Sequence, residues 1–286
     1  MTIADMPPPV GGTVPRMLWL DLTRKCQLQC THCYNDSGPA GTHGTMSRED
    51  WIGVIDQAKG TGVTWVQLIG GEPTMHPDAG DLLCHALDLG MAVEVYSNLV
   101  HVPAAWWDLF QRDGVSIATS YYAADASGHN AVTGRPSHRL TRRNIVRAVQ
   151  LRVPIRIGIV DTGNPHRAED ARRDLETIGV TRIRVDRVRA FGRASKSRPP
   201  EAGELCGRCG TGRASVGPTG EVSPCPMSAV LSVGNVNTTE LAAILGGAAM
   251  TEATEAIRGA VPTITDCDPD GECSPGYGDS GCSPRT

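Results

Sequence analysis

Three cysteines stand close together near the start of the chain, in the stretch RKCQLQCTHCYND. Cys26, Cys30 and Cys33 follow a C-x3-C-x2-C spacing directly after the apolar run MLWLDLT. Structural zinc sites usually use four ligands arranged in C-x2-C pairs, whereas three thiolates in one short loop suit a [4Fe–4S] cluster with one iron left without a protein ligand. The loop therefore predicts an iron–sulfur site whose free iron can bind a small molecule. A structural zinc site and a chance grouping of buried cysteines are the alternatives.

The ten cysteines of the chain fall into two groups. In a reducing cytosol, clustered cysteines more often bind metal or do redox chemistry than form disulfides. Cys84 stands alone inside a helical pattern and is read as a small buried apolar residue. The distribution predicts two separate metal sites. The second group lies in the last third of the chain and consists of Cys206, Cys209, Cys225, Cys267, Cys273 and Cys282.

Composition excludes several classes of partner. The 286 residues carry a formal net charge of −4, and the pI is near 6.1. This balance does not indicate binding to nucleic acid or to an anionic membrane. The longest apolar stretch, LAAILGGAAM, is too short to cross a bilayer, and the N-terminus lacks the basic and apolar segments of a signal peptide. We therefore expect a cytoplasmic protein with no nucleic-acid or membrane partner.

Strand and helix patterns alternate over the first two thirds of the chain. Six strand–helix units argue for an α/β fold with a parallel sheet and right-handed crossovers. They are fewer than the eight of a complete barrel, so a partial (β/α)6 TIM-like barrel is the first expectation and a doubly wound sheet the second. Both folds gather chemistry at the C-terminal ends of their strands, where the cysteine loop lies. Strands are expected at 17–23, 63–69, 91–97, 115–120, 154–160 and 182–188.

Changes in composition predict three segments. Residues 1–16, rich in Pro and Gly, are expected to form a flexible tail, and 17–195 the barrel. The stretch ASKSRPPEAGE is a plausible linker, and 196–286 would form a small cysteine-rich domain. Short strands are expected around RASVGPTGEVSP and a helix near TTELAAIL.

Further polar residues follow the expected strands. Gly70, Gly71 and Glu72 in IGGEPT end the second strand, where glycines allow close approach of a ligand and a carboxylate can meet an ammonium group. Taken alone, this stretch reads as a turn. The next strand ends, at Ser97–Asn98 and at Thr119–Ser120, are individually typical of caps and turns.

A row of arginines near the sixth strand is less specific, comprising Arg182, Arg184, Arg187 and Arg189. Such a row is most often a solvated strand face, although one of the four could bind a carboxylate.

Taken together, the cysteine loop after the first strand, His32 before its last cysteine and the GGE stretch after the second strand resemble the radical S-adenosylmethionine (SAM) enzymes. The resemblance implies that Cys26, Cys30 and Cys33 hold a [4Fe–4S] cluster whose free iron binds the amino and carboxylate groups of SAM. One electron from the cluster would cleave SAM to methionine and a 5′-deoxyadenosyl radical, which abstracts hydrogen from the substrate.

The same resemblance assigns roles at the other strand ends. It implies that Gly70, Gly71 and Glu72 hold the methionyl amine of SAM and that Ser97 and Asn98 lie near its ribose. Ser120 would reach the ribose or the substrate, and His32 would pack on the cluster. No individual catalytic residue is predicted.

The C-terminal cysteines resemble a SPASM or twitch extension, which carries auxiliary iron–sulfur clusters. Ten residues separate Cys209 from Gly220 and four separate Gly220 from Cys225, in agreement with the family's pattern. The end, CDPDGECSPGYGDSGC, departs from the usual C-x2-C-x5-C-x3-C and keeps only the gap between Cys267 and Cys273. We expect one or two auxiliary [4Fe–4S] clusters held by Cys206, Cys209, Cys225 and later cysteines, with zinc as the alternative.

The resemblance implies an oxidoreductase of the SPASM/twitch subclass that modifies a ribosomally made peptide in natural-product biosynthesis, by crosslinking or oxidation. A dehydrogenase or epimerase acting on a sugar or aminoglycoside-like molecule is the alternative, and a non-catalytic metal-binding scaffold is a third reading. The expected partners are the substrate and an external electron donor of the flavodoxin or ferredoxin type. Because about 16 residues precede the first strand, a separate leader-peptide-binding protein, or the barrel itself, would bind any leader.

Overall fold

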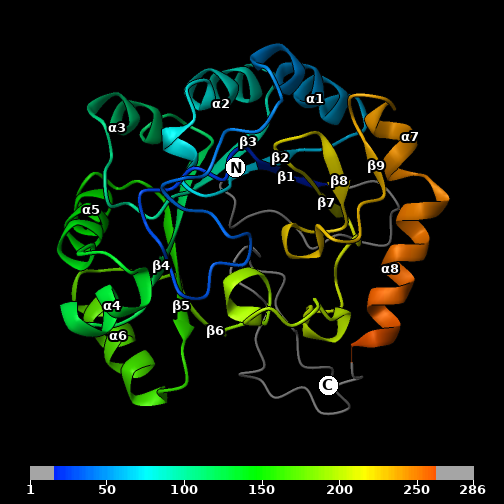
Figure 1. The fold of residues 1–286 in the computed structure, drawn as a ribbon. Coiled ribbons are helices and arrows are strands. Elements are labelled where there is room, and N and C mark those ends of the chain that lie inside the picture. The colour runs from blue at the N-terminus through cyan, green and yellow to red at the C-terminus, as the bar shows by residue number, and fades with distance from the viewer. Residues whose placement is uncertain (1–15, 262–286) are drawn as a thin grey trace, which may run out of the picture.

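The structure is a computed structural model that describes residues 16–261. Its strands form one curved sheet in the order β6-β5-β4-β3-β2-β1-β7-β8-β9 (Figure 1). The first six strands are parallel, and each pairs with the next one along the chain. They are β1 (Met17–Asp21), β2 (Trp65–Ile69), β3 (Ala92–Tyr96), β4 (Val115–Tyr121), β5 (Ile155–Asp161) and β6 (Ile183–Arg187).

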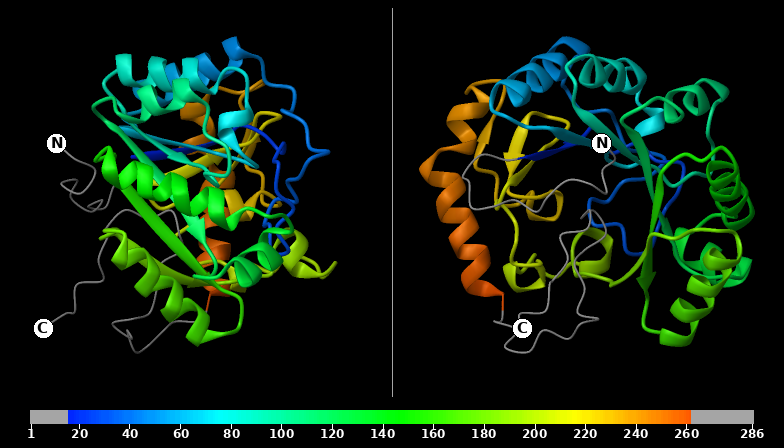
Figure 2. Two further views of the ribbon diagram at one scale, coloured as in Figure 1. Left: turned by 90° about the vertical axis from the view of Figure 1, so that its left-hand side faces the viewer. Right: turned by 180° about the vertical axis from the view of Figure 1, so that it is seen from behind.

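The strand order never reverses, as it must in a doubly wound sheet. The expected partial barrel of six strands is therefore confirmed, and the second expectation is not. Helices cover the convex outer face of the sheet, and the concave face looks into the molecule (Figures 1 and 2). The helices between the strands are α1 (Arg48–Gly60), α2 (Ala79–Asp88), α3 (Ala104–Phe110), α4 (Ala126–Thr133), α5 (His138–Gln150) and α6 (Pro165–Thr177), with a 3-10 turn, η2 (Pro73–Met75).

Local sequence signals explain the helix ends. A reciprocal capping box between Ser47 and Asp50 starts α1. The side chain of Asp125 caps α4 by accepting a hydrogen bond from the Gly128 N–H, and Gly134 ends α4 in the left-handed region. Helix α4 was not expected, because its sequence, ASGHNAVT, is polar and lacks a clear apolar period.

The alternation of side chains along β1 divides the core into two parts. Leu18 and Leu20 point outward and pack with the helices in the large outer core. Met17 and Trp19 point to the concave face and pack in a second cluster with residues from the C-terminal part of the chain, including Cys209. Because alternate residues of a strand face opposite sides, one strand joins the two cores.

Beyond β6 the chain returns to the free edge of β1. Strand β7 pairs in parallel with β1, so the sheet continues into the C-terminal part. The expected domain boundary at 195/196 falls at the end of the 3-10 turn η3 (Gly192–Ser195) and stays a prediction. Cys267, Cys273 and Cys282 lie outside the described residues. The elements are η3 (Gly192–Ser195), η4 (Ala202–Glu204), β7 (Arg213–Val216), β8 (Glu221–Ser223), η5 (Pro226–Ser228), β9 (Gly234–Asn235), α7 (Leu241–Leu245) and α8 (Ala248–Ala260).

None of the helices described here has the length and apolar character needed to cross a membrane.

Candidate functional site

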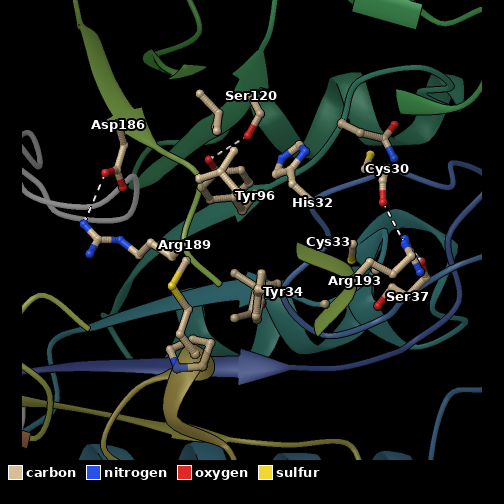
Figure 3. Close-up of a pocket in the computed structure, with 18 of the residues that line it drawn as sticks. Cys30, His32, Cys33, Tyr34, Ser37, Tyr96, Ser120, Asp186, Arg189 and Arg193 are labelled. Atoms are coloured by element: carbon tan, nitrogen blue, oxygen red, sulfur yellow. Dashed lines mark hydrogen bonds and ion pairs between the residues drawn. The ribbon is translucent and has the colours of Figure 1, made fainter. Parts of the chain in front are cut away.

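The described cysteines of both groups line one cavity on the concave side of the sheet. Figure 3 shows part of its wall, with Cys30 and Cys33 of the N-terminal loop. The volume of the cavity is about 220 Å³. The sequence predicted two separate sites, and the structure places the described thiols of both around the same space. The cavity is lined by Cys26, Cys30 and Cys33 from the N-terminal loop and by Cys206, Cys209 and Cys225 from the C-terminal part.

The N-terminal cysteine loop leaves the end of β1 and folds back on itself. The backbone N–H of Cys26 donates to the carbonyl of Gly38 at 3.1 Å, and that of Cys33 donates to the carbonyl of Cys30 at 3.3 Å. The thiol of Cys26 also accepts a hydrogen bond from the Leu28 N–H at 3.4 Å. These contacts hold the loop in a tight turn, so that all three thiols face the cavity.

The donor set of this loop fits a [4Fe–4S] cluster. Burial is the main reason that the pKa of the Cys26 and Cys30 thiols is raised to about 12. The negative charge of Glu72 also raises the pKa of Cys26, and that of Cys33 also raises the pKa of Cys30. A cation bound there would reverse this shift, since coordinating thiols lose their protons. Within residues 16–261 no three His, Cys, Asp or Glu side chains converge on a single ion. A cubane does not require such convergence, because each thiolate binds a different iron.

Arg193, from the turn η3, fastens the cysteine loop. Its Nε donates to the carbonyl of Cys30 at 2.7 Å, and a terminal nitrogen donates to the carbonyl of Ser37 at 2.7 Å (Figure 3). Its backbone N–H reaches the carbonyl of Cys33 at 2.9 Å. Gly192 makes this approach possible, since a Cβ there would lie 2.3 Å from the Cys33 oxygen. The sequence analysis missed Arg193, which is separated from the loop by about 160 residues.

The two glycines of the GGE stretch pack against the start of the cysteine loop. Gly70 has φ +139°, and a Cβ on it would lie 2.5 Å from the Thr23 oxygen. A Cβ on Gly71 would lie 2.3 Å from the Lys25 oxygen. Both glycines also line the cavity. They bring the ends of β1 and β2 into close contact, and their role toward SAM stays a prediction.

Glu72 is fully buried behind these glycines and is not among the residues that line the cavity. One carboxylate oxygen accepts hydrogen bonds from the backbone and side chain of Thr74, and the other accepts one from the Asn98 N–H at 2.8 Å. Burial raises the pKa of Glu72 despite these bonds. In this structure Glu72 ties the end of β2 to the end of β3. Its contact with the SAM amine stays a prediction.

The other expected ligand residues lie at neighbouring strand ends. Asn98 lines the cavity, and its side-chain amide lies 3.6 Å from the Cys26 sulfur. Ser120 lines the cavity and bonds to the Tyr96 hydroxyl at 3.0 Å. Ser97 is fully buried, and its hydroxyl accepts a hydrogen bond from the Leu99 N–H at 3.1 Å. Asn98 and Ser120 can thus meet a ligand directly, whereas Ser97 supports the turn behind them.

The described C-terminal thiols, those of Cys206, Cys209 and Cys225, also line the cavity. The sulfurs of Cys209 and Cys225 are 3.1 Å apart, and both residues are buried. Contacts with Cys206 and Cys225 raise the pKa of Cys209, and the hydrogen bond from Cys209 lowers that of Cys225. Such a close group of thiols suits a second metal centre, for which later cysteines would supply any further ligands.

An aromatic group that the sequence did not reveal lies beside the N-terminal loop. The ring of His32 meets Tyr122 edge-on at 5.1 Å, and Tyr122 meets His129 at 5.2 Å. Burial, followed by the charge of Arg193, lowers the pKa of His32 to about 4. His32 is therefore a neutral ring that lines the cavity between two of the thiols.

One buried ion pair lines the cavity, and a second is hydrogen-bonded to the lining residue Gln67. Arg156 binds both oxygens of Glu94 at 2.7 Å, and Gln67 links Glu94 to the indole of Trp19. Near the end of β6, Asp186 and Arg189 form a buried pair at 3.2 Å, which also lines the cavity (Figure 3). Of the arginines noted near the sixth strand, Arg189 is the buried one.

Two protein families match the chain. The profile of the radical SAM superfamily matches residues 20–175, and that of the SPASM iron–sulfur cluster-binding domain matches residues 206–274.

Curated relatives include PqqA peptide cyclases. The protein from Streptomyces rochei is 28% identical over 204 residues, which are 69% of this chain and 55% of the relative. The protein from Xanthomonas euvesicatoria is 31% identical over 166 residues, which are 56% of this chain and 41% of the relative. The chain thus spans about half the length of the curated relatives it matches.

Solved structures share the fold. Streptococcus suis SuiB bound to its precursor peptide SuiA has a TM-score of 0.71 at 15% identity, covering 86% of this chain and 67% of SuiB. The structure of anSMEcpe with bound AdoMet and a peptide has a TM-score of 0.67 at 13% identity, covering 85% of this chain and 83% of that one. At these identities the likeness concerns the fold alone.

Proposed function

Because the chain belongs to the radical SAM superfamily and carries a SPASM domain behind the barrel, we propose that it is an enzyme that cleaves SAM reductively and modifies a peptide substrate. The observation that carries this proposal is the shared cavity. The thiols of the cysteine loop and the described thiols of the C-terminal part line one space of about 220 Å³. A substrate between them would lie within reach of both sets of thiols.

The residues present fit the cofactors that the family implies. Cys26, Cys30 and Cys33 would hold the SAM-binding [4Fe–4S] cluster, and Cys206, Cys209 and Cys225 an auxiliary cluster. When bound, the reduced cluster supplies the electron that splits SAM into methionine and a carbon-centred radical. The chain itself contributes a dry, shaped space, since its part is to bind, to orient and to exclude water.

Several side chains would perform this positioning. Asn98 and Ser120 are polar groups at the strand ends with access to the cavity, suited to the ribose or the substrate. The ring of His32 shields the cluster position and stays neutral because its pKa is low. The pair of Asp186 and Arg189 offers one acceptor and one donor on the far wall, which suits an amide or another neutral polar group of a peptide.

A peptide is the substrate that the comparisons favour. The curated relatives are named PqqA peptide cyclases, and SuiB is described with a precursor peptide bound. We propose a carbon–carbon crosslink or a side-chain oxidation on a ribosomally made peptide. An external one-electron donor is required for this chemistry, and a separate leader-binding protein is a further proposed partner.

Anaerobic reconstitution tests the enzymology directly. The loaded protein should form 5′-deoxyadenosine from SAM when dithionite is added. The variant in which Cys26, Cys30 and Cys33 are all alanine should form none, whereas Cys84→Ala, outside both cysteine groups, should match the wild type. Iron should amount to about eight atoms per chain with one auxiliary cluster and about twelve with two.

The substrate class is decided by mass spectrometry of reaction mixtures. Candidate precursor peptides encoded beside the gene should lose two hydrogens on crosslinking. Turnover of a sugar or aminoglycoside instead, with solvent deuterium entering carbon in the case of an epimerase, would replace the peptide proposal with the small-molecule one. Retained SAM cleavage in the triple cysteine variant would reject the assignment of the cluster loop.

A further inference from the structure

The outer side of the cysteine loop is a surface framed by exposed basic side chains. Gln29 and Thr31 are exposed, while Cys30 between them lines the cavity. The loop is therefore a single layer of chain between the solvent and the proposed cluster. A molecule that rests on Gln29 and Thr31 would sit one residue away from a ligand of that cluster.

The first basic flank comes from the junction of α4 and α5. The Gln29 N–H donates to the carbonyl of Thr133 at 3.0 Å, and the Thr31 N–H donates to that of Val132 at 2.9 Å. These bonds fix the end of α4 directly against the loop, as Figure 1 also shows. Arg135 follows two residues after Thr133 and is exposed, as is Arg139 in the first turn of α5.

Most of the charge of this flank has no acidic partner within residues 126–152. Residues 126–152 contain six arginines and no Asp or Glu, in a chain whose net charge is −4. Arg142 is neutralised by its bidentate pair with Asp174. Arg135 and Arg139, by contrast, have no ion-pair partner within residues 16–261. Their charges are directed to the solvent beside the loop.

The second basic flank lies on the other side of the loop. Arg193 binds the carbonyl of Cys30, and the exposed residues Lys196 and Arg198 follow it within five positions. Figure 1 shows the loop lying between α4 and η3. Asp36 is the exposed acid of the loop, and Asp125 uses its carboxylate to cap α4. Basic groups thus flank the exposed residues Gln29 and Thr31 from both sides.

We infer that this surface is the docking site for a small acidic one-electron donor protein of the flavodoxin or ferredoxin class. The inference rests on the proposed function, which requires an electron to reach the cluster from outside. One electron would leave the donor's flavin or iron–sulfur group, the donor would be oxidised by one electron, and the cluster behind Cys30 would be reduced by one. Complementary charge would steer the donor to this face, since the chain as a whole repels an acidic protein.

Charge reversal on the first flank tests the site. The variant Arg135→Glu/Arg139→Glu removes two cations and adds two anions beside the loop. The matched control is Arg152→Glu/Arg258→Glu. Arg152 lies just beyond the far end of α5, about 20 Å from Arg139 at 1.5 Å per residue. Arg258 lies on α8, on the opposite side of the molecule in both face-on views (Figures 1 and 2).

Two readouts are needed. The first is the Kd of a flavodoxin for the reconstituted protein, measured anaerobically at low and at high ionic strength. The second is the rate of 5′-deoxyadenosine formation, driven either by flavodoxin with NADPH and its reductase or by dithionite. We expect the docking variant to lose at least about tenfold in flavodoxin affinity and flavodoxin-driven rate at low salt, while its dithionite-driven rate equals that of the control.

The outcomes separate the two proposals. Equal flavodoxin affinity in the docking and control variants overturns the docking site, as does an equal loss with dithionite, which would indicate a structural role for α5. Wild-type protein that makes no 5′-deoxyadenosine with dithionite overturns the proposed function, and the Kd comparison then still decides the docking site. A flavodoxin Kd that does not change with salt concentration would also contradict the docking site, because exposed charge interactions are screened within about 10 Å at 0.1 M salt.

Discussion

The Nε of Arg193 lies 2.7 Å from the carbonyl oxygen of Cys30 and donates a hydrogen bond to it. This contact joins the turn after β6 to the cysteine loop after β1, at the two extremes of the barrel in sequence. The same guanidinium also binds the Ser37 carbonyl. The loop that would hold the cluster is thus held on its inner side by a residue outside the motif itself.

Replacing Arg193 by Gln should loosen the cluster. Two charge-assisted hydrogen bonds would be lost, and each is worth about 1.5–3 kcal/mol. We expect iron to be released at least about tenfold faster when an iron chelator is added, measured by the decay of cluster absorbance under anaerobic conditions. Arg48→Gln, which removes an exposed arginine from α1, is the control. Equal release rates in the two variants would show that Arg193 does not fasten the loop.

The sequence could predict the parts of the fold that depend on local periodicity. The strand cores, their parallel order and the position of Cys26, Cys30 and Cys33 after β1 follow from apolar runs and spacing. Arg193 could not be predicted, because nothing local in GRASKSR indicates which distant carbonyl its guanidinium reaches. The shared cavity was missed for a similar reason. It depends on β7 pairing with β1, and the short sequence RASV carries no signal that selects its neighbour.

The glycines at the end of β2 provide a second test, through Gly71→Ala. The added Cβ would lie 2.3 Å from the carbonyl oxygen of Lys25, so the start of the cysteine loop would have to move. Overpacking of this kind costs about 1–3 kcal/mol. We expect reduced iron incorporation and a lower unfolding midpoint in urea. Gly53→Ala is the matched control, since its Cβ meets nothing within 4 Å and lies within α1. That variant should gain about 0.5–1 kcal/mol.

The C-terminal thiols should be separable from SAM cleavage. In the variant Cys209→Ala/Cys225→Ala, two sulfurs that lie 3.1 Å apart are removed. We expect iron to fall by about four atoms per chain, while dithionite-driven 5′-deoxyadenosine formation continues and the modified peptide is no longer made. Iron analysis and mass spectrometry of the two products measure this directly. Cys84→Ala should change neither, and simultaneous loss of SAM cleavage in the double variant would contradict independent sites.

The buried ring of His129 makes the unfolding free energy depend on pH. It is buried, its Nδ1 has no hydrogen-bond partner within the described residues, and it packs against Tyr121 and Tyr122. Burial, followed by the charge of His138, lowers the pKa of His129 to about 4. In the unfolded chain His129 has the ordinary histidine pKa of about 6.5. Between about pH 4 and pH 6.5 the unfolded chain therefore binds a proton at this residue, whereas the folded chain does not. The stabilising effect of the neutral ring is complete above pH 6.5 and is lost as the pH falls toward 4.

His129→Phe should remove this pH-dependent contribution to the unfolding free energy while keeping an aromatic ring in the same place. Relative to the wild type, the variant should gain about 2 kcal/mol in unfolding free energy between pH 7.5 and pH 5, because each pKa unit is worth about 1.4 kcal/mol. Anaerobic urea unfolding of both proteins at the two pH values gives this difference, in which the contribution of the clusters cancels. The control variant is His101→Gln, which replaces an exposed histidine outside the buried aromatic group. A wild-type slope in the His129 variant would mean that the buried ring already accepts a proton in the folded state.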